Sequence, residues 1–175
     1  KSAFRDRIVH HAVCNSIEER FEKCFIYDSY ANRKGKGTLK AIERFDSFKR
    51  KVSKNFTQTA YVLKADIRHY FETVDHSVLL SLLKRRIKDD KILWLIQKIL
   101  QNYTLAGEGK GMPLGNLTSQ FFANVYLHEL DSFVKQTVGA KYYIRYVDDF
   151  VILNPSRQEL EKYFSVMKIT LQKNI

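Results

Sequence analysis

The chain has 175 residues, of which 30 are Lys or Arg and 19 are Asp or Glu, so its formal net charge is +11. A hydrophobic content of 45% is too high for a disordered protein, and no apolar run approaches the ~18–20 residues of a membrane span. Two Cys residues are too few for a disulfide framework and indicate free thiols in a reducing, cytoplasmic compartment. The excess of positive charge favours a polyanionic partner, nucleic acid before membrane.

The spacing of apolar residues predicts six helices and three short strands, with no internal repeat or linker between them. Helices are expected over 4–23, 38–51, 75–87, 89–100, 118–136 and 157–173, with Trp94 in the core. One strand is expected over 61–67, and two more over 141–153, where they meet at Asp148-Asp149. A basic loop with two Gly covers 32–37, and a loop with four Gly and one Pro covers 104–116.

Two acidic positions stand among apolar strand residues. Asp66 comes at the end of the strand predicted from Tyr61, and Asp148-Asp149 interrupts the apolar pair of strands. A carboxylate in such surroundings must be paired, hydrogen-bonded or bound to a metal. Asp-Asp is also a poor two-residue turn, and its like charges are best tolerated beside a divalent cation. A solvated turn is the simpler alternative.

The pair Asp89-Asp90 serves as a control, because a helix cap between two Lys residues explains it without any chemistry. The other three carboxylates, on neighbouring strands, suit Mg²⁺, a hard ion that takes oxygen ligands. Two such ions ~3.5–4 Å apart can activate a 3′-hydroxyl and stabilise a leaving pyrophosphate. This reaction agrees with the basic charge of the chain.

Five segments resemble, in the same order along the chain, motifs of the reverse transcriptase family: 4–11, 28–35, 65–71, 111–120 and 146–149. The segment around Asp66 resembles the first catalytic motif, and Tyr146–Asp149 resembles the Tyr-x-Asp-Asp box. Residues 111–120 resemble the Gly-Pro-Gly loop that opens the palm helix. The form of 114–120 is most similar to bacterial retroelement enzymes, especially those of diversity-generating retroelements.

The resemblance implies an α+β polymerase palm, in which a small antiparallel sheet packs on helices beside a helical remnant of the fingers. It assigns 1–57 to part of the fingers and 58–175 to the palm, without the thumb or the N-terminal fingers hairpin. The implied activity is RNA-directed DNA synthesis, in which a deoxynucleoside triphosphate extends a DNA or RNA primer on an RNA template. Catalysis is expected of a longer enzyme rather than of this fragment.

The same resemblance assigns roles to individual residues. Asp66 and Asp148 would hold two Mg²⁺ ions (or Mn²⁺), Asp149 would assist, and the backbone carbonyl of Ile67 could be a further ligand. Tyr70 or Phe71 would pack under the incoming sugar, with core packing as the alternative for either ring. Contact with the template–nucleotide pair would come from the loop residues Gly111, Leu114, Gly115 and Asn116, unless the loop is an ordinary one.

Two further assignments concern specificity and nucleic acid. Leu114 stands where intron and retroviral enzymes carry a Gln, which predicts selection of nucleotides by shape and error-prone copying. The basic residues Arg33, Lys34 and Lys36 could contact phosphates of the template or primer, and a solvated loop is the alternative.

Two other functions compete with templated synthesis. A retroelement-derived defence protein would extend DNA without a template, and a non-catalytic module would bind nucleic acid on the same fold. The intact trio of Asp residues disfavours the non-catalytic module. A membrane-surface protein is disfavoured because no predicted helix is both strongly basic on one face and apolar on the other.

Overall fold

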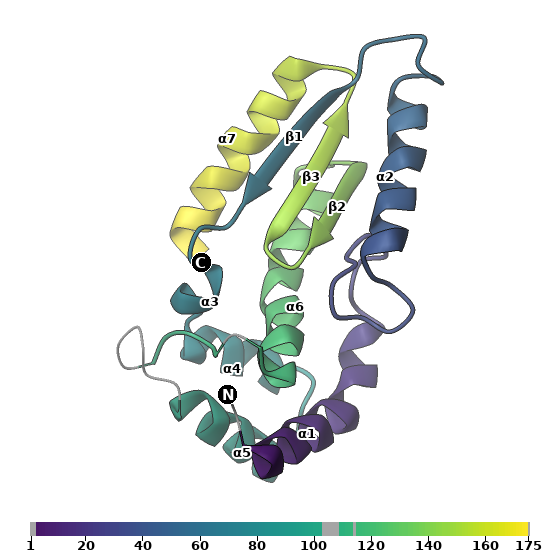
Figure 1. The fold of residues 1–175 in the computed structure, drawn as a ribbon. Coiled ribbons are helices and arrows are strands. Elements are labelled where there is room, and N and C mark those ends of the chain that lie inside the picture. Colours follow the sequence, from purple (N-terminus) through teal and green to yellow (C-terminus); the bar gives the residue numbers. More distant parts are fainter. Residues whose placement is uncertain (1–2, 103–108, 114, 175) are drawn as a thin grey trace. The chain divides into compact units, whose positions relative to one another are not determined.

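The computed structural model describes residues 3–102, 109–113 and 115–174 (Figure 1). Leu114 and the first part of the predicted loop 104–116 lie outside this range. In chain order the elements are α1 (Phe4–Glu22), α2 (Thr38–Val52), β1 (Tyr61–Asp66), α3 (Tyr70–Thr73), α4 (His76–Lys84), α5 (Asp90–Gln101), α6 (Leu117–Ser132), the π-helix η1 (Phe133–Thr137), β2 (Tyr142–Tyr146), β3 (Asp149–Asn154) and α7 (Arg157–Asn174). No helix in the described part of the chain is long and apolar enough to cross a bilayer.

Two helices, α4 and α5, begin at polar caps that the sequence predicts, whereas Thr38, expected as a cap, is the first residue of α2 and follows the N-cap Gly37. The Asp75 carboxylate accepts hydrogen bonds from the backbone N–H groups of the first turn of α4, and Asp89 does the same for α5. Two expectations were wrong. The helix expected over 118–136 ends as a π-helix after Ser132. Trp94 is 60% exposed, because only one side of α5 is buried and the ring lies on the other.

The chain divides into two compact units, each assembled from two stretches of sequence. One unit consists of Lys1–Phe25 with Arg68–Leu127, and the other of Ile26–Ile67 with His128–Ile175. The first is helical, and the second, called the sheet unit below, contains all three strands with α2 and α7. A boundary between fingers and palm at 57/58 stays a prediction.

Aromatic and aliphatic side chains fill the helical unit. Rings from α1 and α6, Phe21 and Phe121, meet edge-to-face with their centroids 5.6 Å apart. Leu79 on α4 and Ile96 on α5 have no exposed surface. Gly111 and Met112 are fixed to this unit by their backbone, since the Gly111 N–H donates to the Val74 carbonyl at 2.8 Å and the Met112 N–H to the Phe71 carbonyl at 2.6 Å.

The sheet has the strand order β1-β3-β2, with both pairs antiparallel. β3 is therefore the central strand, although it comes last in the sequence. α7 packs on β1 and β3, and α2 packs on β2 and β3 (Figure 1). The α+β class predicted from the sequence, with a small antiparallel sheet packed on helices, is confirmed.

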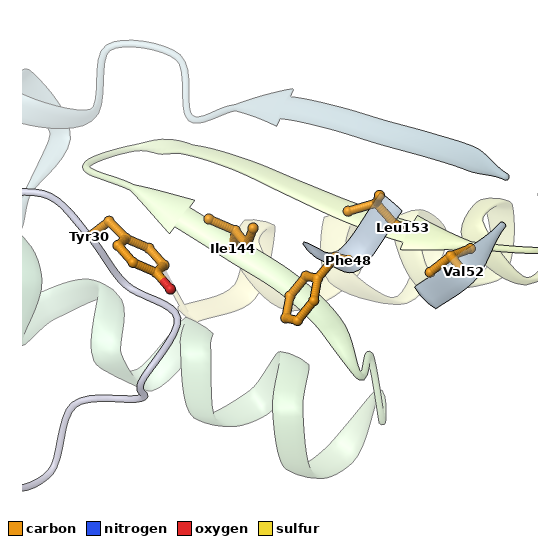
Figure 2. Close-up of a cluster of buried hydrophobic side chains, with 5 residues drawn as sticks. All are labelled: Tyr30, Phe48, Val52, Ile144 and Leu153. Carbon is orange, nitrogen blue, oxygen red and sulfur yellow. The ribbon is translucent and has the colours of Figure 1, made fainter. Parts of the chain in front are cut away.

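A hydrophobic cluster fastens α2 to the sheet. Figure 2 shows Phe48 and Val52 of α2 with Tyr30, Ile144 and Leu153, all buried. Side chains alternate along a strand, and directly paired residues point to the same side. Ile144 and Leu153 therefore lie on the face of the sheet that also carries Asp149. α2 covers the β2 side of this face and leaves the β1 side open to solvent.

Candidate active site

Three carboxylates meet at one corner of the sheet unit. Asp66 is the last residue of β1, and its direct partner across the ladder is Asp149, the first residue of β3. Asp148 immediately precedes β3, and the charges of Asp66 and Asp149 both act on it. The structure thus brings together the three Asp residues that the sequence singled out, although Asp66 is far from the other two along the chain.

The position of the turn differs from the prediction. Strands β2 and β3 are joined by Val147 and Asp148, and not by Asp148 and Asp149. Because Asp149 belongs to the strand and Asp148 to the turn, the alternation that separates neighbouring strand residues does not apply to this pair. Both carboxylates can therefore face the same site. The positive φ that a tight turn requires falls on Val147, at 55°.

Val147 is strained, since a β-branched side chain in the left-handed region costs about 1–2 kcal/mol. Asn tolerates this region. We therefore expect Val147→Asn to raise the free energy of unfolding by about 1 kcal/mol, read from urea unfolding curves. The matched control is Val151→Asn on β3, where the backbone is extended and Asn should destabilise. An unchanged or lower stability of Val147→Asn would show that the turn carries no strain.

The electrostatics of the corner are those of crowded anions. Asp66 and Asp149 are exposed and Asp148 is half-buried, although apolar residues flank both acidic positions in the sequence. Burial raises the pKa of Asp148, and the charges of Asp66 and Asp149 raise it further. Lys64, two residues before Asp66 on the same strand face, places its Nζ 3.6 Å from Oδ1 of Asp149.

The donor chemistry of this corner fits a divalent cation. Carboxylate oxygens are the ligands that Mg²⁺ prefers, and the mutual repulsion of these carboxylates is what a cation would relieve. Within residues 3–102, 109–113 and 115–174, no three acidic, His or Cys side chains already form a metal-ligand cluster. The carboxylates must therefore turn toward a common ion before they can share it.

A buried ion pair lies directly behind the turn, and sequence reasoning missed it. The guanidinium of Arg145 donates from Nε and Nη2 to the two carboxylate oxygens of Asp131, at 2.8 and 2.6 Å, and neither side chain has exposed surface. Tyr143 donates its hydroxyl to Oδ1 of Asp131 at 2.8 Å. An Arg within the apolar strand 142–146 was the available signal, because a buried cation requires an acidic partner.

An apolar groove of about 230 Å³ opens beside Asp149. One wall is α2, with Ala41, Ile42 and Phe45, and the other is formed by β2 and β3. At its end the hydroxyls of Thr38 and Tyr146 lie 2.9 Å apart. The groove gives the carboxylates a hydrophobic flank on the α2 side.

The residues predicted to contact the nucleotide belong to the helical unit. Tyr70 is buried and donates its hydroxyl to the Ala123 carbonyl at 3.1 Å, which is the core packing named as its alternative. Phe71 is only half-buried, so it is the better candidate of the two for contact with a sugar. Gly115 has a φ of 89° with open space around its Cα, and Asn116 directly precedes α6.

The basic loop uses two of its three cations locally. Arg33 donates from Nη1 to the carbonyls of Ile26 and Ser29 and to the Ser29 hydroxyl, at 2.6–2.9 Å. Lys36 donates to the Tyr27 carbonyl at 2.7 Å and lies 3.5 Å from the centre of that ring. Lys34 is exposed. Contact of the loop with nucleic acid stays a prediction, for which Lys34 is the best placed.

The model of the family described as "Reverse transcriptase (RNA-dependent DNA polymerase)" matches residues 2–174. The group II intron-encoded protein LtrA of Lactococcus lactis subsp. cremoris is 30% identical over 138 residues, which cover 76% of this chain and 22% of that protein. An uncharacterised 91 kDa protein in the cob intron of Schizosaccharomyces pombe is 30% identical over 136 residues, covering 75% of this chain and 16% of that protein. The chain thus spans about a fifth of the length of such relatives.

Solved telomerase structures share the fold. That of Candida albicans, in complex with a fragment of telomeric RNA, superposes with a TM-score of 0.64 at 11% identity, covering 90% of this chain and 31% of that one. Apo telomerase of Candida tropicalis, truncated of its C-terminal domain, gives 0.60 at 15% identity, covering 92% and 35%. At these identities the likeness concerns the fold alone.

Proposed function

Because the chain belongs to the reverse transcriptase (RNA-dependent DNA polymerase) family, we propose that it supplies the catalytic carboxylates of an enzyme that copies RNA into DNA. The observation that supports this most directly is the meeting of Asp66, Asp148 and Asp149 at one corner of the sheet unit. In the reaction, the 3′-oxygen of a primer bonds to the α-phosphorus of a deoxynucleoside triphosphate, and pyrophosphate leaves.

The three carboxylates have separate tasks in this proposal. Members of the family generally use divalent metal ions. Asp66 and Asp148 would hold two Mg²⁺ or Mn²⁺ ions, with the Ile67 carbonyl as a further ligand, and these ions would supply positive charge for activation of the primer 3′-hydroxyl and for departure of pyrophosphate. Asp149 assists, and Lys64 balances its charge while no cation is bound. The open β1 side of the sheet face gives the primer access to this corner.

Nucleotide selection is assigned to the helical unit. Phe71 would contact the sugar, and Gly115 would let the backbone approach the base pair because it has no side chain and open space around it. Asn116, directly before α6, would line the same approach. The half-buried state of Phe71 supports the first assignment. Leu114 cannot hydrogen-bond a nucleotide as a Gln can, so we expect shape to dominate selection there.

Lys34 is proposed as a phosphate contact. The slope of log K against log salt concentration is negative, and removing one such contact should lower its magnitude by about 0.7–0.9. We expect Lys34→Ala to produce this decrease in RNA-binding titrations from about 50 to 200 mM salt. Lys162→Ala is the control, since Lys162 is an exposed cation of the same unit that pairs with Glu159 at 2.9 Å. Equal slopes for the two variants would show that Lys34 does not contact RNA phosphates.

Primer extension by the full-length protein tests the proposed activity against both alternatives. With an RNA template, a DNA primer, deoxynucleoside triphosphates and Mg²⁺, we expect products whose length and sequence follow the template. Synthesis that continues unchanged without template would favour the defence protein. RNA binding without synthesis, unaffected by Asp148→Asn, would favour the non-catalytic module.

The retroelement subclass and the cellular compartment extend the proposal. The relatives named above are intron-encoded proteins, whereas the motif at 114–120 favours a diversity-generating retroelement. A template repeat with a variable repeat beside the coding sequence would support the latter, and an intron RNA core would redirect the assignment. Cys14 and Cys24 are free thiols, which supports the reducing cytoplasm as the compartment.

A further inference from the structure

The turn that carries Asp148 is attached to the buried guanidinium behind it. Nη1 of Arg145 donates to the carbonyl oxygen of Val147 at 2.9 Å, while Nε and Nη2 are occupied by Asp131. One planar group therefore joins the C-terminal end of α6 to the turn. The Val147 carbonyl and the Asp148 nitrogen belong to the same peptide bond. The contact from Arg145 therefore fixes the backbone on the N-terminal side of Asp148.

Stability alone is a weak explanation for this arrangement. Removing two charges from water costs about as much as their attraction returns, and well-packed apolar residues often serve a core better. A two-point contact with a carboxylate instead fixes the orientation of the guanidinium plane. With that plane set by Asp131, and Asp131 held in turn by the Tyr143 hydroxyl, Nη1 points at the Val147 carbonyl.

The turn requires such direction because its backbone is in an unfavourable state. Val147 has a φ of 55°, which a β-branched residue adopts only when its surroundings hold it there. The main chain of Arg145 is itself fixed, since its N–H donates to the Asp28 carbonyl and its carbonyl accepts from the Tyr30 N–H, both at 2.9 Å. The hydrogen bond from Arg145 to the Val147 carbonyl, called the clamp below, therefore starts from a strand residue whose own backbone is hydrogen-bonded on both sides, and it ends on a strained turn.

We propose that Arg145 is a positioning residue of the active site, which holds the Val147–Asp148 turn so that Asp148 faces Asp66 and Asp149, with Asp131 and Tyr143 as its supports. This inference rests on the proposed function. Arg145 has no exposed surface, so it acts on substrates and cations only through the turn.

Two variants of the full-length protein test the clamp. Arg145→Lys keeps the charge but loses the planar fork. The triple variant Tyr143→Phe, Asp131→Leu, Arg145→Met removes the network without leaving a buried charge or an unpaired hydroxyl. Arg157→Lys is the matched control, because Arg157 makes an exposed pair with Glu161 at 2.9 Å. Each protein is assayed for thermal unfolding, single-nucleotide incorporation, Mn²⁺ binding by electron paramagnetic resonance, and hydrogen exchange of the turn.

We expect kcat to fall about 100-fold in both variants, as for a misplaced reacting group, with the KM for nucleotide within about threefold of wild type. Mn²⁺ binding without nucleotide should weaken about tenfold, as for loss of a group that orients a metal ligand, and the peptide containing Val147 should exchange faster. The control should match wild type in every assay. A folded triple variant or Arg145→Lys protein with wild-type kcat and wild-type Mn²⁺ affinity would overturn the proposal.

The readouts separate failure of the clamp from failure of the proposed function. If the wild-type protein does not extend a primer, Mn²⁺ binding and hydrogen exchange still report the clamp, and unchanged values in both would refute it. If the triple variant does not fold, the same assays on Arg145→Lys and on the milder variant Tyr143→Phe test the proposal. A kcat that falls only in proportion to the unfolded fraction would mean that the network is merely structural.

Discussion

Replacing Asp148 with Asn is expected to abolish primer extension, by at least about 10³-fold, and at the same time to leave the metal-free fold as stable as wild type or more stable. The loss of activity follows because a carboxylate that holds a cation contributes several kcal/mol to the transition state. The gain in stability, up to about 1 kcal/mol, follows from removal of one of three crowded like charges. Asp89→Asn is the control, since Asn caps a helix as well as Asp.

The difference in stability between Asp148→Asn and wild type should depend on pH, and its direction follows from the pKa of Asp148. The ordinary pKa of an Asp is 3.8, and burial together with the charges of Asp66 and Asp149 raises that of Asp148 in the native state. At a pH between the ordinary pKa of the unfolded chain and the raised pKa of the native state, the native protein binds more protons at Asp148 than the unfolded chain does. The free energy of unfolding therefore falls as the pH rises through this window. Asp148→Asn removes this loss. In metal-free buffer the stability of the variant should therefore increase relative to wild type as the pH rises above the ordinary pKa of 3.8 and through the raised pKa of Asp148, measured by urea unfolding.

Divalent cations should reverse the order of stability, so that wild type becomes more stable than Asp148→Asn. A ligand that binds only the native state stabilises it by mass action, so Mg²⁺ is expected to raise the unfolding temperature of wild type and not of Asp148→Asn. An Asp148→Asn variant that still extends primers, or one whose unfolding temperature rises with Mg²⁺ as wild type does, would contradict the assignment of Asp148 as a metal ligand.

Asp131→Asn is expected to be among the most destabilising single substitutions in the chain. It leaves the Arg145 guanidinium buried without a counter-charge, at a cost of about 3–5 kcal/mol. For a chain of this size that corresponds to a decrease of about 10 °C in unfolding temperature. Asp46→Asn is the matched control, because Asp46 pairs with Lys49 at 2.7 Å on the surface and should matter by less than about 1 kcal/mol.

The triple variant Tyr143→Phe, Asp131→Leu, Arg145→Met should recover most of that stability, because apolar residues then replace the three polar side chains and no buried charge is left unpaired. The Val147 carbonyl loses its bond to Arg145 in this variant. Urea unfolding of the single and triple variants measures the recovery. A triple variant as unstable as Asp131→Asn would show that packing, rather than the uncompensated charge, causes the loss. A stable triple variant that is inactive would link the network to catalysis.

Local rules were sufficient for most of the helices, though not for α3 or the π-helix after Ser132, and they identified the acidic corner. Asp75 and Asp89 were read as caps from their position before apolar periodicity, and the structure confirms both. The turn was misplaced because Asp148-Asp149 was treated as a pair. The residue with the positive φ, Val147, has its carbonyl bonded to Arg145, whose partner Asp131 lies on another element and leaves no local pattern in the sequence.

Exposure was the second quantity that sequence patterns predicted poorly. Apolar neighbours in the sequence marked Asp66 and Asp149 as unlike ordinary surface charges, yet both lie at strand ends that open to solvent. Trp94 was expected inside because its neighbours are apolar, yet Leu93 and Ile96 occupy the buried side of α5. Periodicity identifies the buried face of an element, whereas the position of its ends depends on the tertiary fold.

The strand order β1-β3-β2 has a consequence for synthesis on the ribosome. β1 emerges early but pairs only with β3, which is translated after α3 to α6 and β2. At ~5–20 residues per second the nascent chain carries β1 without its partner for roughly ten seconds. Tyr61 and Val62, which stay partly exposed even in the finished fold, are then available for intermolecular pairing. The edge of β1 therefore remains open to intermolecular pairing until translation has reached β3.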